Sequence, residues 1–239
     1  MDKSKKIAAI LVGGKGTRLQ PLISHVPKPL APIGDEPFLF LLIRDLVSVG
    51  YKEIILLTGY RHEIIVSTCE KVDLGATLYF SQELIPLGTA GALKQAEKFL
   101  APYDEFLLVN GDTYLDDFTT IATKSLEGAI GLIGVIKPEM NDRYGSIVFN
   151  DETKIISSFQ EKIKNEHAYV NAGIYKFSSE IFSHIPSEVF YSLEVELLPH
   201  LISLGFCIKA APLHGNFYDI GLPESYLNFV ATRKAQCSV

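Results

Sequence analysis

The sequence predicts an α/β fold in which helices cover both faces of a doubly wound, mostly parallel sheet. Short apolar runs alternate with longer segments of helical period along the first half of the chain. These runs are nearly continuous in apolar residues, as is typical of parallel strands buried on both faces. In the second half the runs are more closely spaced, which favours antiparallel strands attached to the parallel core.

The first half is expected to supply the parallel strands and the helices that cross between them. Residues 37–49 carry apolar side chains at helical spacing, and Pro37 suits the first turn of a helix. Further helices are expected at residues 61–72 and 88–100. The expected strands are residues 7–12, 53–59, 77–81 and 105–112.

The second half is expected to add an antiparallel elaboration and two more helices. Helical pattern returns at residues 192–204 and 223–234. No repeat, low-complexity tract or linker divides the sequence, so residues 1–239 are interpreted as one domain. The expected strands of this half are residues 129–136, 145–149, 154–162 and 168–177.

Composition narrows the functional classes. The chain has 239 residues, 47% of them hydrophobic, which is enough for a sizeable core. A net charge of -6 argues against a nucleic-acid partner. Cys69, Cys207 and Cys237 are scattered and lack CxxC spacing, so neither a disulfide framework nor a zinc site is expected.

The N-terminal apolar run is too short for a signal peptide, and no apolar run approaches the length needed to span a membrane. We therefore expect a soluble cytoplasmic protein with no membrane partner.

The segment 10–22, ILVGGKGTRLQPL, predicts a phosphate-binding loop after the first strand. It does not supply the G-x-x-x-x-G-K-[ST] spacing of a Walker loop. In a Rossmann fingerprint a third glycine would stand where Leu19 is found, and the second strand would end in an acidic residue. The second strand here ends LLTGY, so both of these nucleotide-binding motifs are excluded.

What remains is a glycine loop that carries cations. The glycines allow backbone N–H groups to approach an anion, and Arg18 can grip phosphate oxygens with its guanidinium. Lys28 stands between Pro27 and Pro29, which are expected to hold its backbone extended and to fix the place of its cation. For Lys28 taken alone, a solvated surface lysine beside a turn is favoured, but not for Lys28 downstream of this loop.

Asp112 follows a buried strand and a glycine, so it is expected at the carboxyl edge of the sheet, where open α/β sheets bind ligands. A hard cation would explain a carboxylate at that place. A turn-forming or helix-capping aspartate is the alternative. Asp116 and Asp117 are expected to cap the next helix.

Short motifs follow one another along nearly the whole chain. They are LVGGKGTRLQPL, PKPLAPI, EPFLFLLI, QELIPLGTAGAL, LLVNGDTYLD, DRYGSI, FQEK, VNAGIY and FYDIG. Together and in this order they resemble the nucleotidyltransferases that activate sugar 1-phosphates, a family of thymidylyl-, guanylyl- and uridylyltransferases. The resemblance implies the nucleotide-diphospho-sugar transferase type of fold. It also implies that residues 1–112 form the nucleotide-binding part and residues 113–239 the sugar-binding part with the C-terminal helix.

The resemblance assigns roles to individual residues. It implies Arg18, Lys28 and Asp112 as catalytic residues, and Mg²⁺ as the cofactor, held by Asp112 and Asp219. The nucleotide-binding residues that it implies are Gly13, Gly14, Gly16, Thr17, Gln82, Gly88 and Thr89. The sugar-phosphate-binding residues that it implies are Tyr144, Gly145, Glu161, Lys162, Asn171 and Gly173.

The reaction implied by the family agrees with the absence of a nucleophilic triad. The oxygen of a sugar 1-phosphate is already an anionic nucleophile, so no base has to create it. Catalysis then requires neutralisation of charge and positioning of two phosphates, which cations and Mg²⁺ supply. The sequence contains no convincing Ser-His-Asp or Cys-His set, and its six histidines are dispersed.

Within the family, the motifs are most similar to guanylyltransferases that use GTP and D-glycero-α-D-manno-heptose 1-phosphate. Such enzymes make GDP-heptose for a bacterial surface polysaccharide, either a capsule or a lipopolysaccharide. Mannose-1-phosphate guanylyltransferase, N-acetylmuramate-1-phosphate uridylyltransferase and glucose-1-phosphate thymidylyltransferase are alternatives. Outside these activities, an inactive sugar-nucleotide-binding paralogue and a glycosyltransferase that uses a finished sugar nucleotide are considered. Whether the protein is a monomer or a homodimer stays open.

Overall fold

A computed structural model describes residues 6–23, 26–137, 145–160 and 168–237. Its main sheet has the strand order β10-β9-β11-β6-β1-β4-β5, with β8 paired to β11 and β12 paired to β8. The strands are β1 (Ile7–Leu11), β4 (Glu53–Thr58), β5 (Thr77–Gln82), β6 (Glu105–Asn110), β8 (Gly131–Ile136), β9 (Ser146–Phe149), β10 (Ile156–Gln160), β11 (Tyr169–Ser178) and β12 (Ile208–Pro212).

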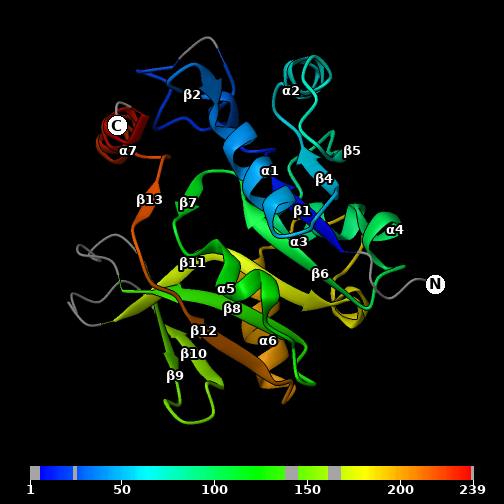
Figure 1. Cartoon of the computed structure of the whole chain (residues 1–239). Helices are drawn as coiled ribbons and strands as arrows, with labels where there is room; N and C mark the ends of the chain where they lie inside the picture. Colours follow the sequence, from blue (N-terminus) through cyan, green and yellow to red (C-terminus); the bar gives the residue numbers. More distant parts are fainter. Residues whose placement is uncertain (1–5, 24–25, 138–144, 161–167, 238–239) are drawn as a thin grey trace.

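Helices and two small strand pairs complete the described fold (Figure 1). The α-helices are α1 (Phe38–Ser48), α2 (His62–Cys69), α3 (Gly88–Gln95), α4 (Glu97–Leu100), α5 (Phe118–Thr123), α6 (Leu198–Ser203) and α7 (Pro223–Cys237). The tighter 3-10 turns are η1 (Lys28–Leu30) and η2 (Ser179–His184), and η3 (Leu193–Leu197) is π-helical. The small pairs join β2 (Pro32–Ile33) to β3 (Glu36–Pro37) and β7 (Thr113–Leu115) to β13 (Phe217–Asp219).

The parallel part of the sheet is β6-β1-β4-β5, and its side chains alternate between two cores. Ala8 and Ile10 of β1 pack in the same core as α1, α2, α5 and α7. Ile7 and Ala9 face the other core, which is closed by α3, α4, η2, η3 and α6. Because both faces are covered, these strands are apolar throughout, which is why their sequence lacks alternation. The expected doubly wound sheet is confirmed.

The strand β11 joins the parallel part of the sheet to the antiparallel part. It runs antiparallel to β8 along one edge, and to β6 and β9 along different stretches of the other edge. Its register against β8 shifts between Asn171 and Tyr175, where Gly173 has a φ of +71°. Such an irregularity bends a strand and redirects its side chains. The expected antiparallel elaboration is therefore present, and it begins next to the last parallel strand.

Some local expectations are wrong. The helix expected at residues 88–100 is interrupted at Ala96, and the helix expected at 192–204 opens with the π-helical turn η3. Asp117 occupies the N-cap position of α5, but its side chain accepts hydrogen bonds from Thr120 Oγ1 and from the His214 N–H instead of capping the helix. Asp116 likewise binds Asn216.

The C-terminal part of the chain returns to the edge where the N-terminal loops lie. Figure 1 shows α7 beside β13 and close to β2, and the hydroxyl of Tyr226 donates a 2.7 Å hydrogen bond to the carbonyl of Pro32. Across the described residues, no helix combines the length and apolarity that a membrane span requires. Cys69 and Cys207 form no disulfide.

Candidate active site

The carboxyl ends of four parallel strands meet at one edge of the sheet. The chain runs from β1 to β4 and β5 on one side and returns to β6 on the other, so the strand order reverses next to β1. Open α/β sheets bind ligands at such a point. Backbone hydrogen bonds continue past the strands and hold the loops together, for example from the Tyr60 N–H to the Gly13 carbonyl (3.0 Å) and from the Glu83 N–H to the Thr58 carbonyl (2.8 Å).

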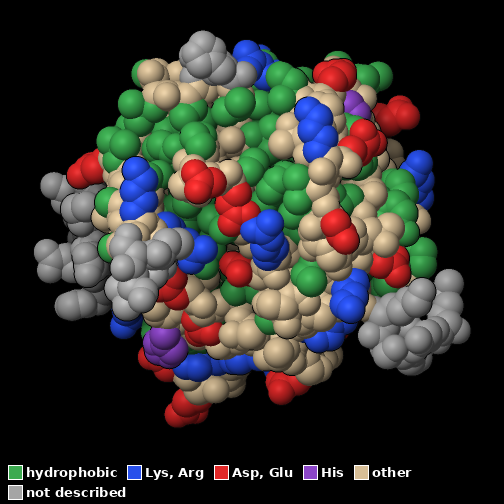
Figure 2. Space-filling view, turned by 45° about the horizontal axis from the view of Figure 1, so that its top comes forward, with side chains coloured by type: hydrophobic (Ala, Val, Ile, Leu, Met, Phe, Trp, Pro, Cys, Tyr) green, Lys and Arg blue, Asp and Glu red, His purple; other side chains and the backbone are tan. Residues whose placement is uncertain are grey.

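A cavity of about 620 Å³ opens at this edge. Its volume lies within the range of small-molecule sites, about 300 to 1,000 Å³. Figure 2 shows a hollow on this side of the molecule, with acidic and basic side chains close together around it. The cavity is lined by Leu11, Val12, Gly13, Gly14, Lys15, Lys28, Pro29, Leu57, Gly59, Tyr60, Gln82, Glu83, Leu84, Ile85, Pro86, Gly88, Thr89, Ala92, Asn110, Gly111, Asp112 and Phe190.

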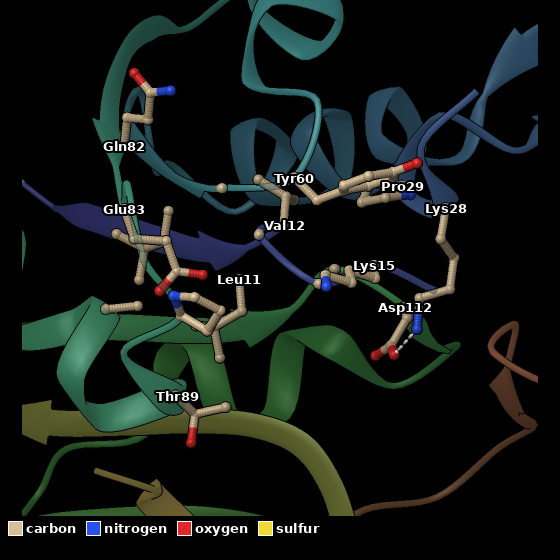
Figure 3. Close-up of a pocket in the computed structure, with 18 of the residues that line it drawn as sticks. Leu11, Val12, Lys15, Lys28, Pro29, Tyr60, Gln82, Glu83, Thr89 and Asp112 are labelled. Atoms are coloured by element: carbon tan, nitrogen blue, oxygen red, sulfur yellow. Dashed lines mark hydrogen bonds and ion pairs between the residues drawn. The ribbon is translucent and has the colours of Figure 1, made fainter. Parts of the chain in front are cut away.

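Lys28 supplies a cation at one end of the cavity. Pro27 is extended, but Lys28 itself opens the 3-10 turn η1, so the expected extended backbone at Lys28 is wrong. The side chain of Lys28 is only 14% exposed and forms an ion pair with Asp112 (Figure 3). A solvated surface lysine is therefore excluded at this position.

Asp219 lies beside this pair, although it comes from the far end of the sequence. The β7–β13 pairing places Asp219 opposite Thr113, and the Ile220 N–H donates to the Asp112 carbonyl at 2.9 Å. A Cβ atom built on Gly221 would lie 2.8 Å from Asp219 Oδ1, 3.2 Å from Lys28 Nζ and 3.7 Å from Asp112 Oδ2. The ammonium and the two carboxylates therefore surround one point of the backbone.

The electrostatics of Asp219 reflect this crowding. Burial and then the negative charge of Asp112 raise the pKa of the Asp219 carboxyl. A hydrogen bond from the Gly221 N–H and the charges of Lys28 and Arg18 act in the opposite direction on the same pKa. Two neighbouring carboxylates repel each other unless a cation lies between or beside them.

The residues present fit a magnesium ion. Among the described residues no group of three or more His, Cys, Asp or Glu side chains forms a closed metal cage. Mg²⁺ does not need such a cage, because it usually keeps several waters and is bound by one or two carboxylates together with substrate phosphates. Asp112 and Asp219 provide that donor set next to the cavity.

Comparison with known proteins identifies the family. The model of the family described as nucleotidyl transferase matches residues 7–236 of this sequence. This chain belongs to the nucleotidyl transferase family. The roles of Lys28, Asp112 and Asp219 in its site stay predictions.

Two similar relatives are named D-glycero-alpha-D-manno-heptose 1-phosphate guanylyltransferase. The one from Campylobacter jejuni is 36% identical over 93% of this chain and 98% of its own length. The one from Aneurinibacillus thermoaerophilus is 33% identical over 96% of each chain. A mannose-1-phosphate guanyltransferase of Candida albicans is 36% identical over 92% of this chain, which spans only 62% of that longer protein.

Solved structures of the same fold agree with these relatives. HddC from Yersinia pseudotuberculosis superposes with a TM-score of 0.84 and is 31% identical, covering 95% of this chain and 99% of its own. A complex of HddC with GMP-PN superposes with a TM-score of 0.83. A Bacillus anthracis protein named as a putative glucose-1-phosphate thymidylyltransferase has the same fold at 22% identity.

The predicted nucleotide-binding residues of this nucleotidyl transferase mostly gather at the cavity. Gly13, Gly14, Gln82, Gly88 and Thr89 line it. Their contacts with a nucleotide stay predictions. The hydroxyl of Thr89 is held in place by other contacts, since it donates to Glu194 (3.1 Å) and accepts from the Leu193 N–H (2.7 Å).

The remaining residues of the glycine loop lie beside the cavity. Gly16 packs against the side chain of Lys28, whereas Thr17 and Arg18 are exposed and do not line the cavity. Arg18 nevertheless lies close enough to influence Asp219. Lys15, to which no site role was given, does line the cavity.

The predicted sugar-side residues are only partly described. Tyr144, Glu161 and Lys162 lie outside the described residues. Gly145 is exposed, while Asn171 donates to the hydroxyl of Tyr175 at 2.6 Å. A Cβ on Gly173 would lie 2.7 Å from Asn110 Nδ2, so Gly173 touches a cavity-lining residue.

Two cavity residues were missed by the sequence reasoning. Asn110 Oδ1 is buried and has no hydrogen-bond partner among the described residues, so it is available to a ligand donor. Glu83 places a half-buried carboxylate in the cavity wall. Asn110 stands two residues before the predicted Asp112, and Glu83 directly follows the predicted Gln82. A polar side chain at the end of a buried strand was the available signal.

Proposed function

We propose that this chain transfers a guanylyl group from GTP to D-glycero-α-D-manno-heptose 1-phosphate, releasing pyrophosphate and GDP-heptose. The observation that carries the proposal is the meeting of Lys28, Asp112 and Asp219 at one end of a nucleotide-sized cavity. The two heptose 1-phosphate guanylyltransferases that are spanned almost end to end favour this sugar and this base. The product would serve a bacterial surface polysaccharide, and the reaction would take place in the cytoplasm.

In this reaction an oxygen of the sugar phosphate forms a bond to the α-phosphorus of GTP. The bond from that phosphorus to the bridging oxygen breaks, and pyrophosphate leaves with the electron pair. The attacking oxygen is already anionic, so the chain has to bring two anions together rather than remove a proton.

The side chains and loops of this chain suit that task. Lys28 and Lys15 would neutralise phosphate charge, and the loop with Gly13 and Gly14 lets backbone approach the nucleotide closely. The buried setting of Lys28 keeps its cation at a fixed place, which favours alignment of the reacting groups. Mg²⁺, when held by Asp112 and Asp219, would supply additional charge neutralisation between the phosphates.

Mannose 1-phosphate is the second candidate acceptor. The Candida albicans mannose-1-phosphate guanyltransferase is as similar in sequence as the Campylobacter jejuni relative, at 36% identity. The chain spans 62% of that protein, and 98% and 96% of the two heptose relatives. The described residues do not include Glu161 and Lys162, which are predicted to contact the sugar phosphate.

A matrix of four nucleoside triphosphates against heptose, mannose, glucose and N-acetylmuramate 1-phosphates tests the proposal. We expect release of pyrophosphate with GTP and heptose 1-phosphate, and only when Mg²⁺ is present. If no combination releases pyrophosphate, the chain is an inactive paralogue or a glycosyltransferase, and the proposal is wrong. Activity with UTP or dTTP but not with GTP would contradict the guanylyl assignment alone.

The same assay tests the polar centre. Asp112→Ala should reduce kcat at least about 100-fold, because the preorganised charge at the reacting phosphates is lost. Asp151→Ala is the matched control, since Asp151 is exposed and far from the cavity lining. A folded Asp112→Ala protein that keeps the wild-type rate would remove Asp112 from the active site.

A further inference from the structure

Glu83 is a carboxylate in the cavity wall that the phosphate chemistry does not use. It follows β5, directly after Gln82, and its side chain is half-buried. Its Oε2 atom accepts a 3.0 Å hydrogen bond from the Leu87 N–H. Its Oε1 atom lies 2.8 Å from the place of a Cβ on Gly13 and on Gly59. Three loops therefore fix the carboxylate at the wall of the cavity.

Among the described residues, no positive charge acts on the pKa of Glu83. Burial raises the pKa of the Glu83 carboxyl, and within the described part of the chain the Leu87 N–H is the group that acts against this rise. A half-buried carboxylate without a cation is costly unless a ligand brings hydrogen-bond donors. Each carboxylate oxygen has two lone pairs, so the bond to Leu87 leaves acceptor capacity on both oxygens.

Glu83 also lies away from the phosphate end of the cavity. Figure 3 shows Lys28 and Asp112 on one side of the cavity and Glu83 on the other, with the amide of Gln82 pointing away from the carboxylate of Glu83. A nucleotide whose phosphates lie near Lys28 would extend its base toward this wall. The base therefore meets a carboxylate with free acceptor positions.

The hydrogen-bonding groups of the bases decide which base suits a carboxylate. A carboxylate with two acceptor oxygens matches two adjacent N–H donors. Guanine presents such a pair, N1–H and N2–H, on its Watson–Crick edge. Uracil and thymine present one N3–H between two carbonyl acceptors, and adenine and cytosine place a ring-nitrogen acceptor beside their amino group. A carboxylate would repel these acceptors.

We propose that Glu83 is the residue that selects guanine, by accepting hydrogen bonds from N1–H and N2–H of GTP. This inference rests on the proposed guanylyl transfer and names the group that sets its base specificity. Gln82, to which contact with the base was assigned from the resemblance, then has a lesser part in the choice of base.

The test compares GTP with inosine triphosphate, which lacks the N2 amino group, in the wild type and in Glu83→Gln. The wild type should prefer GTP in kcat/KM by about 10- to 100-fold, the range for one hydrogen bond to a charged group. In Glu83→Gln the side-chain amide keeps its size but faces the guanine donors with a donor of its own. The preference should fall to about one, mainly through a higher KM for GTP, while kcat stays within a few-fold.

Glu63→Gln is the matched control, because Glu63 is an exposed glutamate of α2 outside the cavity. It should keep the wild-type preference. An unchanged GTP preference in Glu83→Gln would overturn the inference and leave guanylyl transfer intact. Should Glu83→Gln fail to fold, equal kcat/KM values for the two nucleotides in the wild type would overturn it instead.

Failure of the proposed function gives a different result. If the matrix releases pyrophosphate with UTP or dTTP but not with GTP, this inference and the guanylyl assignment both fall. If no triphosphate reacts, the role of Glu83 is tested by measuring the affinities for GTP and inosine triphosphate by calorimetric titration. A preference for GTP that disappears in Glu83→Gln supports this role. Equal affinities in the wild type contradict it.

Discussion

Gly16 connects the glycine loop to the lysine of the active site. Its φ is +60°, and a Cβ atom at this position would lie 2.7 Å from the Cβ of Lys28. Glycine is therefore required twice, for the left-handed backbone and for the close contact with the lysine stem. Any larger residue would have to displace the side chain that forms the ion pair with Asp112.

Gly34 is a useful comparison, because it has the left-handed backbone of Gly16 without the close contact. Its φ is +64°, but a Cβ atom there would meet nothing within 4 Å. Gly34→Ala should lower the free energy of unfolding by about 1 kcal/mol, measured by urea denaturation, because it places alanine in the left-handed region. Gly16→Ala should lower it further, since its Cβ atom also meets the side chain of Lys28.

Only Gly16→Ala should also reduce kcat, by 10-fold or more in the pyrophosphate assay, since only this substitution displaces Lys28. Equal activity of the two variants would show that the contact between Gly16 and Lys28 has no part in catalysis.

At the residue level, the sequence predicted the polar centre better than the rest of the cavity. Lys28, Asp112 and Asp219 are brought together as expected, because each belongs to a short motif with its own signature. Asn110 and Glu83 were missed because their signal, a polar side chain at the end of a buried strand, does not by itself show that the side chain faces a cavity. Arg18 was expected at the phosphates, and its exposed place on the loop depends on a backbone path that spacing does not determine.

Among the elements, the short pair β7–β13 has the largest consequence for the site. It holds Asp219 opposite Thr113, one residue after Asp112. Asp116 secures the far end of this pair, because its Oδ2 atom accepts hydrogen bonds from the backbone N–H (3.2 Å) and the side-chain amide (2.8 Å) of Asn216. The geometry of the second carboxylate thus depends on a three-residue strand and one side-chain contact.

Asn216→Ala should weaken this contact and increase the Mg²⁺ concentration needed for half-maximal activity several-fold. The free energy of unfolding should change by less than about 1 kcal/mol, because one exposed hydrogen bond contributes little. Asn228→Ala, on the exposed side of α7, should change neither quantity. An unaltered Mg²⁺ requirement in Asn216→Ala would mean that the β7–β13 pair positions Asp219 without this contact.

The elements that sequence patterns predicted are those long enough to show a period. The four parallel strands and α1 fall within a residue or two of the expected ranges. The pairs β2–β3 and β7–β13 have two or three residues per strand, so they carry no periodicity to detect. The π-helical turn η3 was expected as ordinary helix, since apolar spacing does not distinguish the two.

On the scale of the whole molecule, the two cores bury tyrosines deeply. Burial raises the pKa of Tyr51 and of Tyr175 well above the ordinary tyrosine value, and burial together with the nearby Asp45 raises the pKa of Tyr114 to about 12. In the unfolded chain these hydroxyls titrate near pH 10. The stability linked to these three groups is therefore full below about pH 10 and is lost as the pH rises toward their folded values.

An alkaline titration should show this coupling. The chain has 11 tyrosines and no tryptophan, so near-ultraviolet absorbance follows tyrosinate without interference. The buried Tyr51 and Tyr175 should ionise only together with the loss of circular dichroism. Above about pH 10, Tyr51 and Tyr175 should each reduce the free energy of unfolding by about 1.4 kcal/mol per pH unit. Ionisation of every tyrosine before unfolding would contradict the buried environments.

The place of Asp219 also sets an order of events during synthesis. The strands β1, β4, β5 and β6, with Asp112 and the cavity wall, leave the ribosome long before β13 exists, and chains fold from the N-terminal side as they emerge. The helix α7 follows β13 and packs in the same core as β1, so that core also closes only after β13 has been made. The second carboxylate and the last helix of the core therefore arrive together, and turnover has to wait for both.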